Sequence, residues 1–288
     1  MKKVFSLWIF APLKALPVIL FYITAWILPI SVSSFVFGKL SRMLGPLLKV
    51  HALGLKNLAL AFPEKSPEDH EKILQGVWEN LGRIAGEFPH IPKITKNATY
   101  VTVKNKHILD AVMKIGKPVV FMAGHLGNWE IPHYTLINNQ YRIALISRPP
   151  NNFLIRKLFD WVRSHPFTTV FFKGPEGSRH IMQHLKMGGA LGVLFDQRLS
   201  DGDPLPLFNH PALTATGPAK LAKKYGALMI PVQIERLGNK VQFQVTFHEP
   251  VETDGSPATI MTTFNQLLEG WIRQRPEQWL WLHKRWKI

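Results

Sequence analysis

The stretch from residue 117 to residue 130 reads KPVVFMAGHLGNWE. Its first half is a short apolar run that ends at Gly124, as is typical of a strand buried on both faces. A histidine follows directly, and the next segment has the composition of a helix. A buried strand that turns into a helix is the repeating unit of an α/β fold.

Three further apolar runs are similar to the first and cover residues 142–147, 190–195 and 227–234. Helix-like stretches separate them, and residues 241–251 alternate between apolar and polar side chains, which predicts an antiparallel addition. We therefore predict an α/β fold with a mixed, mostly parallel sheet flanked by helices. The helices expected after the first strand cover residues 129–137, 153–162, 176–186, 217–225 and 260–272.

An uncharged run extends from Ala15 to Gly38, between Lys14 and Lys39. About 20 apolar residues span a bilayer, so the plain interpretation is one membrane-anchoring helix. A helical hairpin or an interfacial helix in one leaflet stays open, because lysines flank both ends of the run. The run is too long for a cleaved signal peptide. We predict an anchor at residues 1–40 and one further domain at residues 41–288.

The composition restricts the possible partners and chemistry. The net charge is +16, from 35 Lys and Arg against 19 Asp and Glu, so the chain attracts anions such as nucleic acid, anionic membranes, phosphorylated lipids or acidic proteins. The absence of cysteine excludes disulfides, thiolate zinc sites and a cysteine nucleophile. No P-loop, G-x-G-x-x-G or H-E-x-x-H motif occurs, so we expect no cofactor and no metal.

The C-terminal segment is rich in tryptophan and in basic residues. This composition suits a membrane interface that faces anionic headgroups. The alternative is that at least two of the indoles pack into the core. With an anchor and this tail, a membrane explains the basic charge, and no nucleic-acid recognition motif is present. The tryptophans are Trp271, Trp279, Trp281 and Trp286.

His125 and Glu130 stand five residues apart, a spacing that chance supplies about once in a chain of this composition. Their position says more: His125 follows a strand end, Asn128 could cap the next helix, and Glu130 falls in its first turn. A neutral imidazole can take a proton from a hydroxyl group, while a nearby carboxylate fixes its tautomer. The structural alternative is that His125 caps the helix and Glu130 complements the helix dipole.

Polar residues also follow two other predicted strands, and active sites gather at such strand ends. Arg148, in SRPPNN, could clamp a phosphate or be an ordinary surface arginine. Asp196 could orient Arg148, bind an acceptor or only end its strand. The helix expected at residues 217–225 offers free N–H groups to an anion or oxyanion, or it has a plain capped start. The predicted substrate-binding residues are Arg148, Asn151, Asp196, Gln197, Thr216 and Gly217.

Six blocks, in order from about residue 55 to residue 288, resemble the bacterial lipid A biosynthesis acyltransferases of the lauroyl or myristoyl transferase type. They read NLALAFPEKS, GHLGNWE, SRPPNN, DQR, FNHPALTATGPAKLAKKYGALMIPV and PEQWLWLHKRWK. The resemblance implies that His125 is the catalytic histidine and Glu130 its paired acid. It also implies that Arg148 and Asp196 are the two other polar positions of the site.

The resemblance implies an inner-membrane enzyme with its catalytic domain on the cytoplasmic side. It would move a fatty acyl chain from acyl carrier protein to a hydroxyl of a Kdo-bearing lipid A precursor. An acidic carrier protein and a phosphorylated lipid acceptor both suit a chain of charge +16. Two alternatives stay open: another lipid acceptor, such as a lysophospholipid, a glycolipid or an aminolipid, and a membrane lipid-binding protein without catalysis. The family often has proline where this chain has Phe195, which should shift that strand end slightly.

Overall fold

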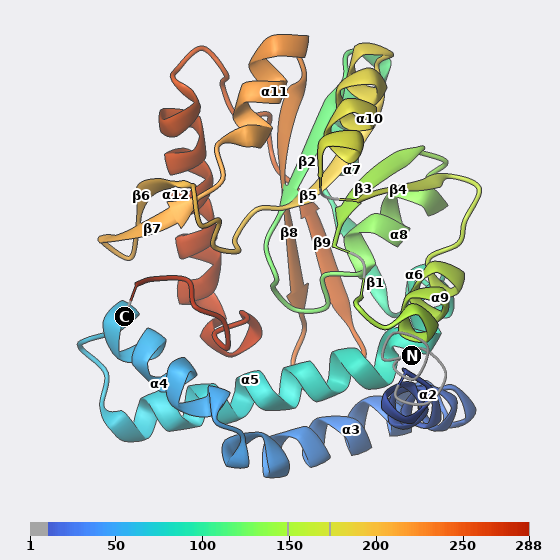
Figure 1. Cartoon of the computed structure of the whole chain (residues 1–288), viewed down its shortest axis with the longest axis vertical. Helices are drawn as coiled ribbons and strands as arrows, with labels where there is room; N and C mark the ends of the chain where they lie inside the picture. The colour runs from blue at the N-terminus through green and yellow to red at the C-terminus, as the bar shows by residue number, and fades with distance from the viewer. Residues whose placement is uncertain (1–10, 149, 173, 288) are drawn as a thin grey trace, which may run out of the picture.

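The computed structural model describes residues 11–148, 150–172 and 174–287. Its strands are β1 (Val101–Lys104), β2 (Val119–Ala123), β3 (Ile143–Ser147), β4 (Thr168–Phe172), β5 (Ala190–Leu194), β6 (Asp203–Leu207), β7 (His210–Thr214), β8 (Leu228–Arg236) and β9 (Phe243–Phe247). Seven of them form one sheet in the order β1-β9-β8-β2-β5-β3-β4, and β6 and β7 form a separate hairpin (Figure 1).

The helices surround this sheet (Figure 1). The α-helices are α2 (Ala11–Ile27), α3 (Ile30–Leu44), α4 (Val50–Ala61), α5 (Pro67–Glu87), α6 (Ile91–Thr95), α7 (Lys106–Lys114), α8 (Ile131–Asn138), α9 (Phe153–Val162), α10 (Pro175–Lys186), α11 (Gly217–Tyr225) and α12 (Pro257–Gln274). Short 3-10 turns lie at η2 (Gly45–Leu47), η3 (Phe88–His90) and η4 (Pro276–Gln278).

The predicted α/β architecture is confirmed. β2 pairs in parallel with β5 and β8, and β3 pairs in parallel with β4 and β5. β9 runs antiparallel to β8, as its alternating sequence predicted. Every residue of β2 is buried, because this strand lies inside the sheet and carries side chains into both faces. The two edge strands, β1 and β4, were not predicted, because their residues are largely half-buried or exposed and their apolar pattern is weak.

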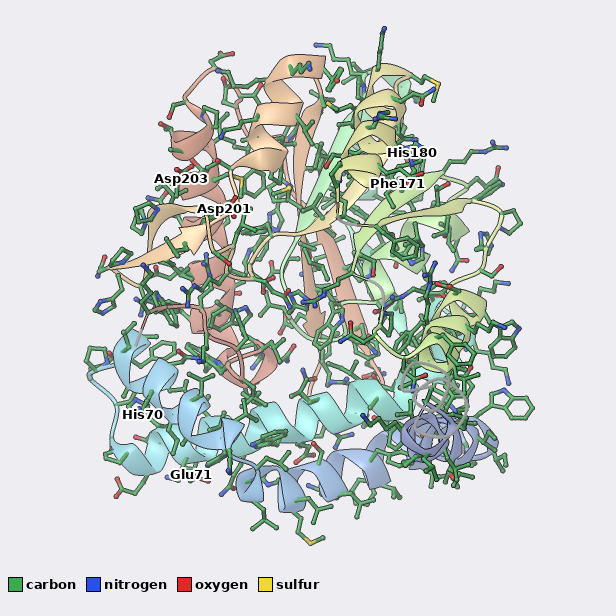
Figure 2. All side chains as sticks on the ribbon, in the orientation of Figure 1. His70, Glu71, Phe171, His180, Asp201 and Asp203 are labelled. Carbon is green, nitrogen blue, oxygen red and sulfur yellow. The ribbon has the colours of Figure 1, made fainter. Side chains whose placement is uncertain are left out.

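The carboxyl ends of the parallel strands face α5, which lies across that edge of the sheet (Figure 1). Asn80 of α5 donates to the backbone oxygen of Gly127 at 3.0 Å, and Asn128 donates to Glu87 of α5 at 2.8 Å. The loop after β2 is thus held by a helix from the N-terminal third of the chain. At the far edge, α10 lies against β4, where the rings of Phe171 and His180 are 5.9 Å apart (Figure 2).

The N-terminal apolar run forms two helices, so the prediction of one helix through Ala15–Gly38 is wrong. α2 ends at Ile27, and Pro29 precedes the first residue of α3. Proline has no N–H to donate and disfavours a helical residue before it, which separates the two helices. Within the described ranges, no helix combines the length and the apolar character needed to cross a membrane. The domain boundary expected at residue 40 falls inside α3.

α3 lies close against α5 because small residues line both helices. A Cβ at Gly82 would collide with the α3 backbone, and one at Gly86 would lie 2.7 Å from the backbone oxygen of Ser33. The Ser33 hydroxyl donates to the backbone oxygen of Gly86 at 2.7 Å, and the Ser34 hydroxyl donates to Glu87 at the same distance. The N-terminal helices therefore belong to the structure that holds the loop after β2.

The C-terminal tryptophans are core residues, so the prediction that they face a membrane interface is wrong. Trp279 and Trp281 are among the largest fully buried side chains, and Trp271 and Trp286 are buried as well. The rings of Trp279 and Trp281 meet edge to face at 4.7 Å. Burial of several large aromatic side chains dominates the local packing energy and anchors the end of the chain.

Candidate active site

His125 and Asp196 form the polar centre of the candidate site. They follow β2 and β5, and the parallel register of these strands sets Ala123 opposite Leu194, which brings the two loops side by side. His125 Nδ1 lies 2.7 Å from Asp196 Oδ1, and the backbone N–H of His125 donates to Asp196 Oδ2 at 2.7 Å. Asp196 is fully buried, whereas the His125 side chain keeps part of its surface exposed.

Asp196 is held as a carboxylate. Its burial acts to raise its pKa, but the charge and the hydrogen bonds of His125 outweigh burial and hold the pKa well below the usual range, with a smaller contribution from His283. The hydrogen-bond geometry assigns the imidazole proton to Nδ1, where Asp196 accepts it. His125 Nε2, which lies 3.4 Å from the side-chain nitrogen of Gln197, is then the basic ring nitrogen.

Glu130 has a different partner from the one predicted. Its carboxylate accepts two hydrogen bonds from Arg163, which directly follows α9: Nη2 to Oε1 at 2.6 Å and Nε to Oε2 at 3.3 Å. The carboxylate that hydrogen-bonds His125 is therefore Asp196 and not Glu130, which the sequence predicted, and Asp196 is bound to His125 and Trp279 rather than to Arg148. Sheet register places Asp196 beside His125, while the start of α8 at residue 131 directs Glu130 toward α9.

A cavity of about 600 Å³ opens beside His125, between the sheet and helices α8 and α9. It extends from the carboxyl end of β3 at Ser147 to the first residue of that strand, Ile143. Four residue steps of a strand cover about 13 Å. Most of the wall is apolar, although Glu130, His133 and Arg163 also line it. A long, largely apolar slot suits an extended hydrocarbon chain. The apolar lining residues include Phe121, Leu136, Ile143, Leu145, Phe159, Val170 and Val193.

One histidine in this wall stays uncharged at neutral pH. Burial lowers the pKa of His133 to about 4, and the opposing effect of Glu130 is smaller. His133 Nε2 lies 2.7 Å from the hydroxyl oxygen of Thr168. Residue 133 therefore adds a hydrogen-bonding group but no positive charge to the apolar part of the cavity. Among the residues that the structure describes, no three His, Asp or Glu side chains are grouped to hold a metal ion.

Comparison with known proteins agrees with this arrangement of base, carboxylate and apolar cavity. A family model of bacterial lipid A biosynthesis acyltransferases matches residues 11–288. The chain belongs to this family. The family resemblance given by the six sequence blocks is thereby confirmed, and the protein is an acyltransferase.

Curated relatives of this acyltransferase act on more than one lipid. It is 27% identical over 278 residues to the lipid A biosynthesis palmitoleoyltransferase of Escherichia coli (strain K12), which covers 91% of this chain and 87% of the relative. It is 25% identical over 248 residues to the lipid A biosynthesis lauroyltransferase of the same strain, covering 81% and 77%. It is 24% identical over 241 residues to the phosphatidylinositol mannoside acyltransferase of Mycobacterium tuberculosis (strain CDC 1551 / Oshkosh), covering 80% and 75%.

The other predicted site residues of the acyltransferase differ in how close they lie to the cavity. Arg148 and Gln197 line it at the carboxyl edge of the sheet, where Arg198 joins them. Asn151 is exposed and is not a lining residue. In the same SRPPNN stretch, Pro149 lies outside the described residues.

The N-terminus of α11 borders the cavity, but the lining residues are the neighbours of the predicted Thr216 and Gly217. Ala215 and Pro218 line the wall, while the Thr216 hydroxyl donates at 2.8 Å to Asp203 of the β6–β7 hairpin, a residue that is labelled in Figure 2. Thr216 thus ties α11 to the hairpin. Gly217 leaves open space where a side chain would stand.

Phe195 stands where the family often has proline, and the pairing of β2 and β5 is not interrupted there. The backbone N–H of Phe195 donates to the backbone oxygen of Ala123 at 3.1 Å, a bond that proline could not make. The pairing of β2 and β5 therefore continues to the residue before Asp196. The Phe195 ring packs on Phe264 of α12 at 5.5 Å.

Several residues that support the acyltransferase site from other parts of the chain were not predicted. Arg163 binds Glu130, and the indole N–H of Trp279 donates to Asp196 Oδ2 at 2.8 Å. Arg236 donates twice to Glu87, at 2.6 and 2.9 Å, and both residues are buried. The only signal for these partners was the tryptophan-rich C-terminal block, and its composition does not say which carboxylate an indole reaches.

Proposed function

We propose that this acyltransferase moves a fatty acyl chain from acyl carrier protein to a hydroxyl of a Kdo-bearing lipid A precursor, on the cytoplasmic side of the bacterial inner membrane. The observation that carries the proposal is the His125–Asp196 pair at the polar end of an apolar cavity. The cavity would take the acyl chain and leave its thioester beside His125. Arg148 and Arg198, on the same cavity wall, provide cations for a phosphorylated substrate.

In the proposed reaction His125 is the general base. With Nδ1–H held by Asp196, Nε2 takes the proton of the acceptor hydroxyl while the hydroxyl oxygen attacks the thioester carbonyl carbon. The C–O bond forms, the C–S bond breaks, and the departing thiolate receives the proton from the imidazolium. The products are an ester and the free thiol of the carrier, and no covalent acyl-enzyme is needed.

A second acceptor class has one specific observation in its favour. The similarity to a phosphatidylinositol mannoside acyltransferase covers 80% of this chain, which is close to the share covered by the lauroyltransferase. A glycolipid hydroxyl could therefore replace the lipid A precursor without any change in the role of His125. Both acceptors are anionic, so the net charge of +16 does not separate them.

Transfer of a radiolabelled acyl chain from acyl carrier protein tests the proposal. Membranes containing the full chain are incubated with a Kdo-bearing lipid A precursor, a mannosylated phosphoinositide or a lysophospholipid. We expect labelling of the first acceptor and a loss of at least ~100-fold in the His125→Ala variant, the usual size of a general-base contribution. His180→Ala, an exposed histidine on α10, is the matched control and should keep full activity.

Two results would contradict different parts of the proposal. Full transfer by His125→Ala would exclude His125 as the base. Labelling of the mannosylated lipid alone, lost in His125→Ala, would keep the mechanism and replace the acceptor.

For the membrane, we propose that the outer face of the N-terminal helices rests in the headgroup region of an anionic leaflet. Most of the exposed large apolar residues of the described chain lie on this face. Lys14 and Lys49 are exposed along the same segment and would meet anionic headgroups, whereas Lys39 is ion-paired with Glu79. The apolar residues are Leu13, Leu16, Leu20, Ile23, Trp26 and Ile27 of α2, with Val32, Phe35, Leu40, Met43, Leu44, Leu47 and Leu48 of the segment that follows.

Vesicle binding of charged variants tests this surface. Trp26 and Phe35 are 57% and 53% exposed, and changing both to Glu should lower binding to phosphatidylglycerol-containing vesicles by about tenfold or more, since each buried apolar side chain contributes about 1.5–3 kcal/mol. Ile115 and Met187, 55% and 72% exposed elsewhere, serve as control positions. Equal losses from both pairs would remove the N-terminal face from the proposal.

A further inference from the structure

The C-terminal segment is built into the loop that carries His125. Leu126 and Trp279 form an antiparallel bridge, and the backbone N–H of Gly127 donates to the backbone oxygen of Gln278 at 3.0 Å. The Gln278 side chain exchanges two hydrogen bonds with the Arg236 backbone, both 2.8 Å long. Trp279 is therefore fixed between the His125 loop and the end of β8.

The Trp279 side chain completes the hydrogen bonding of Asp196. Oδ2 accepts the indole N–H at 2.8 Å and the backbone N–H of His125 at 2.7 Å, while Oδ1 faces His125 Nδ1 at 2.7 Å. An indole N–H can only donate, and it carries no charge. With Oδ2 held by two donors in a fully buried position, the carboxylate cannot rotate away from the imidazole.

We propose that Trp279 is a positioning residue of the acyl transfer reaction: its indole N–H draws off part of the Asp196 charge and aims Oδ1 at His125. The inference rests on the proposed role of His125 as the base and adds what sets its basicity. When a carboxylate loses one hydrogen-bond donor, more of its negative charge is available to the donors that remain, which here include His125. Without the indole N–H, Asp196 therefore stabilises the imidazolium more strongly, and His125 gives up its proton less readily.

Among the residues that the structure describes, the titratable or charged groups that act on Asp196 include His125, His283 and Arg285. Burial lowers the pKa of His283 below its usual value, more than the charge of Asp196 raises it. Burial lowers the pKa of Arg285 to about 10, and Arg285 remains a cation bound to the hairpin residues Leu213 and Thr214. Because carbethoxylation is measured on the His125 peptide itself, that readout separates the titration of His125 from that of His283.

The tryptophan cluster supplies matched controls for a loss of one indole N–H. Trp281 is also fully buried, and its indole N–H donates to the backbone oxygen of Pro276 at 2.7 Å. Trp286 is buried as well, and its indole nitrogen has no hydrogen-bond partner in the part of the chain that the structure describes. Trp→Phe at these three positions removes a similar volume from one cluster, but only one change removes a donor from Asp196.

The experiment compares full-length Trp279→Phe, Trp281→Phe and Trp286→Phe with the unchanged enzyme. Two readouts are followed against pH: acyl transfer, as kcat and KM, and carbethoxylation of His125 by diethyl pyrocarbonate, measured by peptide mass spectrometry. In Trp279→Phe alone, we expect the midpoint of the acidic limb of the pH profile to move to higher pH by roughly half a unit or more in both readouts. A shift of this size corresponds to only part of the free energy of one charged hydrogen bond. The lost transfer rate should lie in kcat at neutral pH and recover largely at higher pH.

Each outcome bears on one of the two proposals. If Trp279→Phe and Trp281→Phe lose activity alike and neither shifts the acidic limb, Trp279 only supports the fold and the inference is overturned. If the three variants differ in transfer but not in carbethoxylation, the inference is overturned as well. If His125→Ala keeps full transfer, the proposed function itself fails, whatever the tryptophan variants do.

Discussion

Asp196→Asn should lower kcat by about three to four orders of magnitude, with little change in the affinity for the acyl donor. Two N–H donors meet at Asp196 Oδ2, so the carbonyl oxygen of an asparagine must occupy that place. Its amide NH₂ then points at His125 Nδ1 and donates to it. The imidazole proton moves to Nε2, and the base is blocked by its own hydrogen atom.

Glu130 is the matched comparison, because the resemblance assigns it as the paired acid while its carboxylate binds Arg163. Since Glu130 and Arg163 act as one pair, Glu130→Gln combined with Arg163→Gln should cost no more activity than either single change. Glu130→Gln combined with Asp196→Asn should multiply the two single losses. Steady-state kinetics of the single and double variants measure both couplings. Full activity of Asp196→Asn would contradict the assignment of Asp196 as the partner of the base.

Glu87→Gln should lower the free energy of unfolding by about 3–5 kcal/mol, the usual effect of leaving one charge of a buried ion pair without its partner. Glu87 is fully buried and accepts from Arg236, Asn128 and Ser34, so it joins β8, the His125 loop and α3. Thermal and urea unfolding followed by circular dichroism measure the change. We also expect lower activity, because Asn128 lies three residues from His125.

The neighbouring pair of Glu235 and Arg275 is the control for this prediction. The side chains of Arg275 and Glu235 are 51% and 18% exposed, so this ion pair is partly solvated and contributes about 1 kcal/mol. Glu235→Gln should therefore change stability little. Replacing both Glu87 and Arg236 by Met should restore most of the stability lost by Glu87→Gln, since no buried charge is then left alone. Equal effects of Glu87→Gln and Glu235→Gln would contradict the buried-pair interpretation.

Local pattern was sufficient for the central strands and for most of the helices. β2 appears in the sequence as an apolar run because all of its residues are buried, and β5 appears as one because it lies between β2 and β3 in the sheet. α9 and α11 have the bounds predicted from the sequence. The edge strands β1 and β4 were not predicted, since strands that face both the core and water contain no continuous apolar run.

The sequence by itself determined the α/β class, the family and the position of His125 at a strand end. Each depends on neighbouring residues or on motifs read in order along the chain. Only the tertiary structure decided which carboxylate serves His125, where Glu130 points, and that the C-terminal tryptophans are core residues. Asp196 lies 71 residues from His125, and Trp279 lies 83 residues from Asp196. Contacts between residues so far apart in the sequence follow from the pairing of strands and from the path of the C-terminal segment. The spacing of five residues between His125 and Glu130 carries no information about strand pairing or about that path.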